Sequence, residues 1–327
     1  MNGCPKAMTF GPCGGVRADE TCEVDGRRCP FCDLPALPMW SPTADTPRDR
    51  PADAARLAAR VWVDFRPDPT LDWEIAEATR PLAAAGAGLL IGEHVDDLTP
   101  HGPATVAGAV TAHGLPVIAT VTCRDRTRDE LSAEIEALRD ARVAAVHCVT
   151  GDHPAARLGL DVNPDYRLDG TALAALAAGS GRVSVAESPA SPPTDWRARR
   201  VLSKQRAGAS VAILNHAGGP RRLADFAHEC RVAGVDLDLI APVPVITDHR
   251  SADALDRFPG LELPTGLVRS ILESEDPHRT GIDAAIALGA ELLESGDFAA
   301  VNLSGSAGDG GLVERAEIMA TVARGLR

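Results

Sequence analysis

Eight short runs of apolar and β-branched residues recur through residues 61–327, and a helix-forming stretch rich in Ala, Leu, Arg and Glu lies between each run and the next. Eight strand–helix pairs of similar length predict an α/β fold of the (β/α)8 class, the TIM barrel. A doubly wound sheet is the alternative, but no G-x-G-x-x-G follows the first run, and units of equal length suit a closed barrel better. The expected strands are 61–65, 88–92, 116–122, 143–149, 182–186, 210–214, 237–241 and 299–303.

Residues 1–32 form a different kind of segment, which holds five of the eight cysteines of the chain. It has too few large apolar residues for a hydrophobic core, so disulfides or a metal must hold it together. A reducing cytosol disfavours disulfides, and thiolates are soft ligands for iron–sulfur clusters and zinc. We therefore expect a 4Fe–4S cluster or zinc, with free thiols on a flexible tail as the alternative. The candidate ligands are Cys4, Cys13, Cys22, Cys29 and Cys32; which four of them bind is open, and Cys32 is the first candidate for a spare.

Composition and charge limit the kinds of molecule that this protein is expected to bind and where in the cell it is expected to be. Residues 33–60 are rich in Pro, Asp and Thr, which predicts a linker between the cysteine-rich segment and the barrel. The net charge of −13 argues against nucleic acid or an anionic membrane surface as a partner. The sequence has no apolar run long enough to predict a membrane span, and its first ten residues lack the pattern of a signal peptide. A cytoplasmic location is therefore expected.

In a (β/α)8 barrel, the side chains that carry out chemistry lie at the C-terminal ends of the strands. Three carboxylates occupy such positions here, and repulsion between them at one mouth would raise the pKa of one and make it a proton donor. Each also has a plainer interpretation: Asp64 in a structural ion pair, Glu93 as a solvated rim residue, and Asp152 as part of a turn. Further residues at strand ends are Thr120, Thr150, Gly151 and Asn215.

Several longer stretches resemble the methylenetetrahydrofolate reductase family. Residues 116–154 are similar to its threonine–cysteine strand end, the helix that follows, and the strand that closes on a Gly-Asp-x-Pro turn. Residues 203–215 resemble its lysine-containing Ala-Gly-Ala strand, 232–247 resemble the following strand and proline-rich turn, and 297–303 resemble the last strand. The N-terminal CPKAMTFGPCGGVR is similar to a cysteine module that accompanies some members, and it is the most specific of these signals.

The resemblance implies a barrel that binds a folate and FAD at the strand ends. It also implies that a hydride moves from NAD(P)H through the flavin to methylenetetrahydrofolate, which gives methyltetrahydrofolate. Only two lysines occur in the chain, Lys6 and Lys204, and both fall inside the motifs quoted above. The expected site residues are Asp64 as the catalytic acid; Asp152, Asn215, Glu93 and Thr120 for the substrate; and Lys204, Thr150 and Gly151 for the cofactor.

Three of these positions depart from the family pattern. Asp64 stands where the family has a glutamate and is one methylene shorter, which shifts a proton donor by about an ångström. Thr120 replaces a histidine and Thr150 replaces an arginine at positions that typically contact FAD. The resemblance therefore predicts a folate site and leaves FAD binding open.

Three functional hypotheses follow from these residues. The first is an oxidoreductase of one-carbon metabolism that reduces 5,10-methylenetetrahydrofolate to 5-methyltetrahydrofolate. The second is a non-redox folate-binding or electron-relay subunit, which would pair with a reductase, electron-transfer or methyltransferase subunit. The third is a folate-dependent one-carbon transferase. A tetrahydrofolate is the expected small-molecule ligand in all three.

Overall fold

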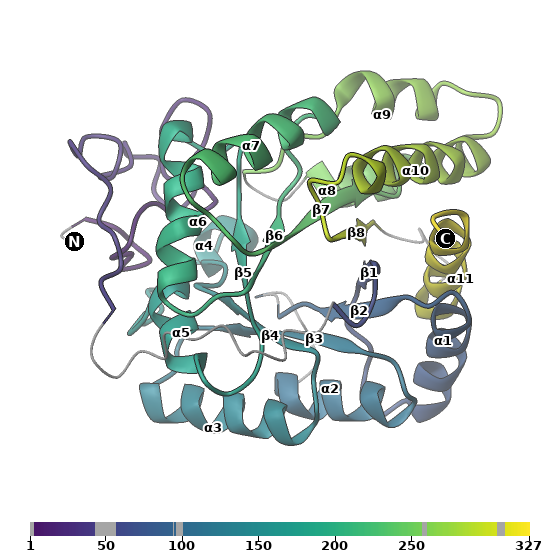
Figure 1. The fold of residues 1–327 in the computed structure, drawn as a ribbon, viewed down its shortest axis with the longest axis horizontal. Coiled ribbons are helices and arrows are strands. Elements are labelled where there is room, and N and C mark those ends of the chain that lie inside the picture. The colour runs from purple at the N-terminus through teal and green to yellow at the C-terminus, as the bar shows by residue number, and fades with distance from the viewer. Residues whose placement is uncertain (1–2, 43–56, 94, 96–100, 257–259, 306–310) are drawn as a thin grey trace.

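The structure, a computed structural model, describes residues 3–42, 57–93, 95, 101–256, 260–305 and 311–327. Eight parallel strands close into a barrel in sequence order, which confirms the predicted (β/α)8 fold (Figure 1). Every expected strand is present, and its bounds differ from the prediction by at most three residues. The strands are β1 (Val61–Asp64), β2 (Gly88–Ile91), β3 (Val117–Thr122), β4 (Ala145–Val149), β5 (Val183–Glu187), β6 (Val211–Leu214), β7 (Asp238–Pro244) and β8 (Ala300–Ser304).

Apolar side chains fill the inside of the barrel below the strand ends. Successive residues of a strand face opposite sides, so one set points inward and the other packs against the helices. Trp62 is fully buried in the inner set, together with Ile118 and Ile240. The indole needs the space next to Gly88, where a Cβ would lie 2.5 Å from the ring. Because this part of the barrel is packed, a ligand inside the barrel could lie only above it, towards the C-terminal mouth.

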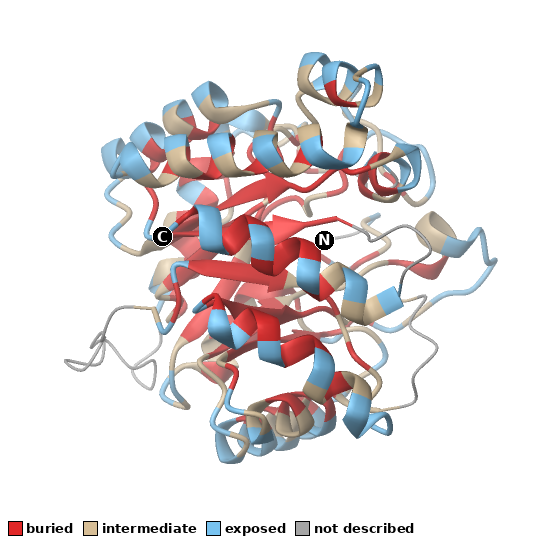
Figure 2. Cartoon of the chain, turned by 90° about the vertical axis from the view of Figure 1, so that its right-hand side faces the viewer, coloured by how far each residue is buried: buried red, intermediate tan, exposed pale blue. Residues whose placement is uncertain are grey.

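The helices cover the outside of the barrel, and the side of each helix that meets the strands is buried (Figure 2). Helix α3 (Arg128–Asp140) shows the pattern: Leu131, Ile135 and Leu138 are buried at helical spacing. It begins at Thr127, whose side chain forms a capping box with Glu130. The other helices are α1 (Asp72–Ala84), α2 (Pro103–Ala112), α4 (Pro154–Leu158), α5 (Gly170–Ala177), α6 (Arg197–Arg206), α7 (Pro220–Val232), α8 (His249–Asp256), α9 (Thr265–Leu272), α10 (Pro277–Glu294) and α11 (Gly311–Gly325), with a 3-10 turn, η1, at Thr194–Trp196.

None of the helices in the described part of the chain combines the length and the apolar character that a membrane crossing requires.

The N-terminal segment, residues 3–42, lies beside α4, α5 and α6 and has little regular secondary structure (Figure 1). Its own small apolar cluster centres on Met8, Val16 and Phe31. Towards its end, the backbone N–H of Trp40 donates to Ser203 Oγ on α6 at 2.7 Å. Residues 43–56 of the expected linker lie outside the described residues, and the division of the chain at residues 32 and 60 stays a prediction.

Asp169 attaches this segment to the barrel. Its Oδ2 accepts hydrogen bonds from the backbone N–H groups of Thr9 and Phe10, both at 2.9 Å. Its Oδ1 accepts from Thr171 and Ala172 at the start of α5, both at 3.0 Å, and so caps that helix. Asp169 is 2% exposed. One buried carboxylate therefore satisfies backbone donors of both the segment and α5.

We expect Asp169→Ala to lower the free energy of unfolding by about 2–4 kcal/mol, because it removes a helix cap and leaves two further N–H groups without their acceptor. Asp276→Ala is the matched control: Asp276 caps α10 through one bond to the Arg279 N–H, so its loss should cost about 1 kcal/mol. Urea unfolding of both variants measures the difference. Equal losses would show that Asp169 acts as an ordinary helix cap and does not hold the segment.

Candidate active site

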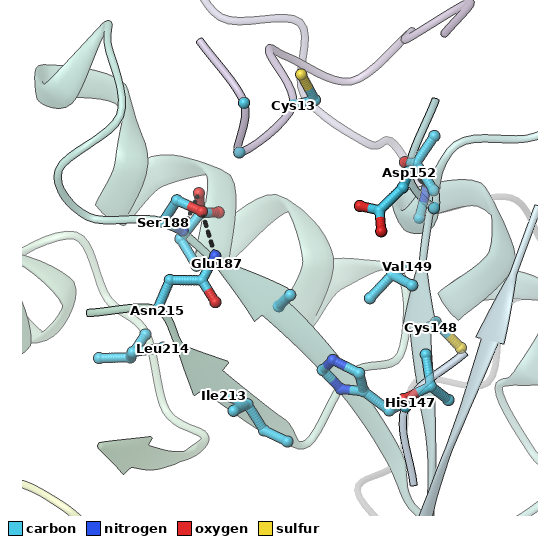
Figure 3. A pocket seen from close by; sticks show the side chains of 18 of the residues that line it. Cys13, His147, Cys148, Val149, Asp152, Glu187, Ser188, Ile213, Leu214 and Asn215 are labelled. Atoms are coloured by element: carbon cyan, nitrogen blue, oxygen red, sulfur yellow. Dashed lines mark hydrogen bonds between the residues drawn. The ribbon is translucent and has the colours of Figure 1, made fainter. Parts of the chain in front are cut away.

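A cavity of about 300 Å³ lies at the C-terminal mouth of the barrel, between the strand ends and the N-terminal segment. Figure 3 shows side chains from β4, β5 and β6 facing it, with Cys13 of the segment on the opposite side. All of the barrel residues that the sequence singled out line this one cavity, although they come from widely separated parts of the chain. These residues are Asp64, Glu93, Thr120, Thr150, Gly151, Asp152, Lys204 and Asn215. Their individual roles remain predictions.

The turn after β4 directs Asp152 towards the cavity (Figure 3). Gly151 has a φ of 96°, and a Cβ there would lie 2.9 Å from Thr122 Cβ, so only glycine fits this turn. The Asp152 carbonyl accepts hydrogen bonds from Tyr166 Oη at 2.9 Å and from Arg124 at 3.1 Å. Asp152 therefore does shape a turn, as its plainer interpretation held, but its carboxylate also lines the cavity.

The other two mouth carboxylates are placed differently. Glu93 accepts hydrogen bonds from Arg126 at 2.6 Å and from the Thr122 N–H at 2.8 Å, so its charge is balanced by a cation. We expected repulsion among three carboxylates at the mouth. Glu93 does not take part in such repulsion, because its charge is paired with Arg126. The Asp64 carboxylate has no hydrogen-bond or ion-pair partner within the described ranges, while its main-chain carbonyl accepts from Arg315. The ion pair suggested for Asp64 is thus not seen among these residues.

A buried charge cluster around Glu187 forms the wall of the cavity between β5 and α6. The Glu187 side chain is fully buried and contacts Arg197 at 3.1 Å, Arg200 at 3.1 Å and Lys204 at 2.8 Å. Burial by itself would raise the pKa of Glu187, but the three cations outweigh it and hold that pKa well below its usual range. Burial, helped by Arg200, lowers the pKa of Lys204 to about 8. Lys204 also donates to the Ala186 carbonyl.

Sequence reasoning missed this cluster. Its signal was present, because Arg197, Arg200 and Lys204 are spaced to lie along one face of a helix. A row of basic side chains on a surface helix normally faces solvent. Here these side chains face the barrel, because Glu187 lies opposite them at the end of β5. Lys204 was expected to meet a flavin, whereas here its ammonium is already held by Glu187 and a carbonyl.

Two neutral histidines line the cavity, His147 on β4 and His216 just after β6, and sequence reasoning assigned them no role. His147 Nδ1 lies 2.9 Å from Ser184 Oγ, and burial together with the charge of Lys204 lowers its pKa to about 3. His216 Nε2 lies 2.8 Å from Ser304 Oγ, and burial lowers its pKa to about 4. Both rings therefore stay uncharged at neutral pH.

Three residues that line the cavity carry a buried polar atom without a hydrogen-bond partner among the described residues. These atoms are Asn302 Oδ1, on β8, Thr171 Oγ1, at the start of α5, and Arg200 Nε, on α6. Asn215, at the end of β6, is already engaged, since its amide donates to Ser188 Oγ at 2.7 Å (Figure 3). Buried polar atoms normally have a partner, so these atoms are available to hydrogen-bond water or a ligand in the cavity.

The N-terminal segment forms the roof of the cavity. Its cavity-lining residues are Lys6, Met8, Cys13, Gly14, Gly15 and Glu23.

Close packing and hydrogen bonds hold this roof in place. A Cβ on Gly260 would lie only 1.7 Å from the Gly14 carbonyl oxygen, so the two backbones meet without side chains between them. Arg197 donates to the Cys13 carbonyl at 3.2 Å, and Ser191 Oγ donates to the Val16 carbonyl at 2.8 Å. Thr150, expected at the cofactor, instead donates from Oγ1 to Met8 Sδ at 3.4 Å and accepts from the Gly170 N–H at 2.9 Å.

The predicted metal site in the segment gains no support from this geometry. All five cysteines are free, and no group of three or more His, Cys, Asp or Glu residues in the described part of the chain is arranged to hold a metal ion. Burial raises the pKa of Cys4, Cys22 and Cys29, the last to about 11, so these side chains are thiols in the metal-free protein. The iron–sulfur or zinc site stays a prediction.

A closed barrel whose acidic, amide and imidazole side chains surround a buried cavity at the strand ends defines the class: a (β/α)8 protein with a small-molecule site. The sequence profile of methylenetetrahydrofolate reductase matches residues 99–308. The chain therefore belongs to the methylenetetrahydrofolate reductase family. No curated protein sequence matches it.

One solved structure shows the same fold, and others match less closely. The first is an uncharacterized protein from Clostridium thermocellum that binds two copies of 5-methyl-5,6,7,8-tetrahydrofolic acid; it has a TM-score of 0.57 and 13% identity, over 81% of this chain and 95% of that chain. At this identity the likeness establishes the barrel alone. A thiamine phosphate pyrophosphorylase from Pyrococcus furiosus matches with a TM-score of 0.42 and 10% identity, over 83% of this chain and 98% of its own.

We expect Glu187→Gln to lower the free energy of unfolding by about 3–5 kcal/mol at pH 7, because it leaves three buried cations without a counter-charge. The cations hold the folded pKa of Glu187 below its unfolded value of about 4.3. Its stabilising effect is therefore complete above that pH and is lost as the pH falls through the folded pKa.

Urea unfolding of both proteins from pH 7 to pH 3 measures this difference. Glu262→Gln is the control, since that carboxylate forms an exposed pair with Arg222 and should contribute less than about 1 kcal/mol. If Glu187→Gln were as mild as the control, the cluster would not hold the cavity wall.

Proposed function

We propose that the protein reduces 5,10-methylenetetrahydrofolate to 5-methyltetrahydrofolate. The observation that carries the proposal is the pair Asp64 and Asp152, which face one cavity of ligand size at the mouth of a barrel of the methylenetetrahydrofolate reductase family. A likeness of fold to a protein that binds methyltetrahydrofolate is in keeping with a folate ligand. Membership of this family favours the reductase hypothesis over the subunit and transferase hypotheses.

The reaction needs one proton and one hydride. The methylene carbon of the substrate bridges two folate nitrogens, so reduction breaks one carbon–nitrogen bond, adds a proton to the nitrogen that leaves, and adds a hydride to the carbon. We assign the role of proton donor to Asp64. Its side chain lines the cavity, and no described residue forms a hydrogen bond or ion pair with its carboxylate. In a completed turnover Asp64 is left as a carboxylate that water reprotonates, and NAD(P)H is oxidised to NAD(P)⁺.

Asp152 and Asn215 would hold the pterin ring. A carboxylate accepts hydrogen bonds only, which suits the amino and N–H groups on one edge of a pterin. The position of Asn215 is set by its bond to Ser188, and the neutral His147 below it adds no charge to the cavity. Asn302 Oδ1 and Thr171 Oγ1 supply further polar contacts, since both lack a partner among the described residues.

The residues present do not fit a flavin. Of the three positions expected at the cofactor, Lys204 is held by Glu187 and the Ala186 carbonyl, and Thr150 is held between Met8 and Gly170. The third, Gly151, is fixed in a tight turn against Thr122. We therefore derive no step through FAD and propose that NAD(P)H gives its hydride to the folate directly.

The test is oxidation of NADH or NADPH by the purified chain, dependent on 5,10-methylenetetrahydrofolate. We expect Asp64→Asn to slow this reaction by about 100-fold or more, because it removes the general acid while keeping the shape of the side chain. Binding of 5-methyltetrahydrofolate should be nearly unchanged. Asp64→Glu keeps an acid and should retain more activity than Asp64→Asn.

Asp68→Asn is the matched control: Asp68 lies four residues further on, contacts Thr70 in the loop after β1, and should leave the rate unchanged. A full rate in Asp64→Asn would remove Asp64 as the acid. Folate binding by the wild-type chain without nucleotide oxidation would favour the non-redox subunit. Methyl transfer to an added acceptor, without nucleotide oxidation, would favour the transferase.

A further inference from the structure

Both lysines of the chain line the cavity, but their ammonium groups are engaged differently. Lys204 is held by Glu187 and by the Ala186 carbonyl. Lys6, which is 6% exposed, forms an ion pair with Glu23, and the described residues offer its ammonium no other hydrogen-bond or ion-pair partner. Because an ammonium has three N–H donors, two of them have no acceptor in this part of the chain.

Buried donors without acceptors are costly, and proteins rarely leave them so. Lys6 sits in the roof of the cavity, and Asp152 of the β4 turn lines the same space. The two groups thus face one cavity of about 300 Å³, Lys6 from the segment and Asp152 from the barrel. When a ligand binds Asp152, the ligand atoms beside that contact can therefore reach the N–H groups of Lys6 that have no acceptor.

We propose that Lys6 binds the carbonyl oxygen of the pterin ring and so selects folates that carry this oxygen. This inference rests on the proposed function. One edge of a pterin presents an amino group, a ring N–H and a carbonyl oxygen in succession: two donors, then one acceptor. Asp152 can accept from both donors, and the acceptor beside them requires a donor from the protein, which Lys6 supplies.

The charge of the site favours a neutral acceptor over an anionic one. Glu23 already balances the charge of Lys6, with side chains that are 8% and 5% exposed. An anion at this point would gain little from that neutral pair and would be repelled by Asp152. A carbonyl oxygen accepts the free N–H groups without adding charge. The N-terminal segment thus contributes a specificity-determining residue to the barrel.

The experiment compares tetrahydrofolate with its 4-amino-4-deoxy counterpart, in which an amino group replaces the pterin carbonyl. Affinities for both are measured by calorimetry on the full chain. Lys6→Met combined with Glu23→Gln removes the ion pair without leaving a lone buried charge, and Glu23→Gln alone keeps Lys6. Arg27→Met is a control on the same segment, since Arg27 is exposed and pairs with Asp25.

We expect the wild-type chain, Glu23→Gln and Arg27→Met to prefer tetrahydrofolate by about tenfold or more, and the double variant to lose about tenfold of that preference. A preference that persists in a folded double variant overturns the role of Lys6 and leaves the proposed function standing. If the double variant does not fold, equal affinity of the wild-type chain for both ligands likewise overturns the role of Lys6. A wild-type chain that binds neither ligand overturns both proposals.

Discussion

The carboxylate of Glu187 and the three cations around it connect parts of the chain that lie far apart in sequence. Arg197 contacts Glu187 and also donates to the Cys13 carbonyl of the N-terminal segment. Arg200 packs under Gly11, where a Cβ would lie 2.8 Å from its Nε. Charges taken out of water are stabilised only when their partners are well placed, so this cluster tolerates little displacement. The end of β5, helix α6 and the roof of the cavity are therefore held in one arrangement.

The cavity that results combines paired charges with neutral polar groups. Glu187 is surrounded by cations and Glu93 is balanced by Arg126, so neither acts as an isolated charge. His147 and His216 are held in their neutral form by burial. Asp64 and Asp152 also face the space where a ligand would lie, from β1 and from the β4 turn, and Asp152 Oδ2 lies 3.8 Å from Arg157 Nε. This separation allows one acid to donate a proton while another binds a ring.

The barrel could be predicted from sequence because each strand is short, apolar and buried on both faces, which gives a continuous run that few other structures produce. Asp64, Asp152 and Asn215 could be placed at one mouth by the rule that strand ends meet there. The Glu187 cluster could not, because a basic helix face and a single strand-end carboxylate give no sign of facing each other. The position of Lys6 was equally hidden, since it depends on how an irregular segment packs over the barrel.

The contact between Gly14 and Gly260 bears on how this protein can change over evolutionary time. Two stretches of main chain touch there with no side chain between them, and each forms part of the enclosure around the same space. A Cβ on Gly260 would force the stretch at Gly14 to shift, and a Cβ on Gly14 would lie 2.4 Å from Ser188 Oγ of the barrel, so enlarging either glycine disturbs the contact between the segment and the barrel. An exchange of the cysteine-rich segment for another would therefore have to preserve this close approach of the two backbones.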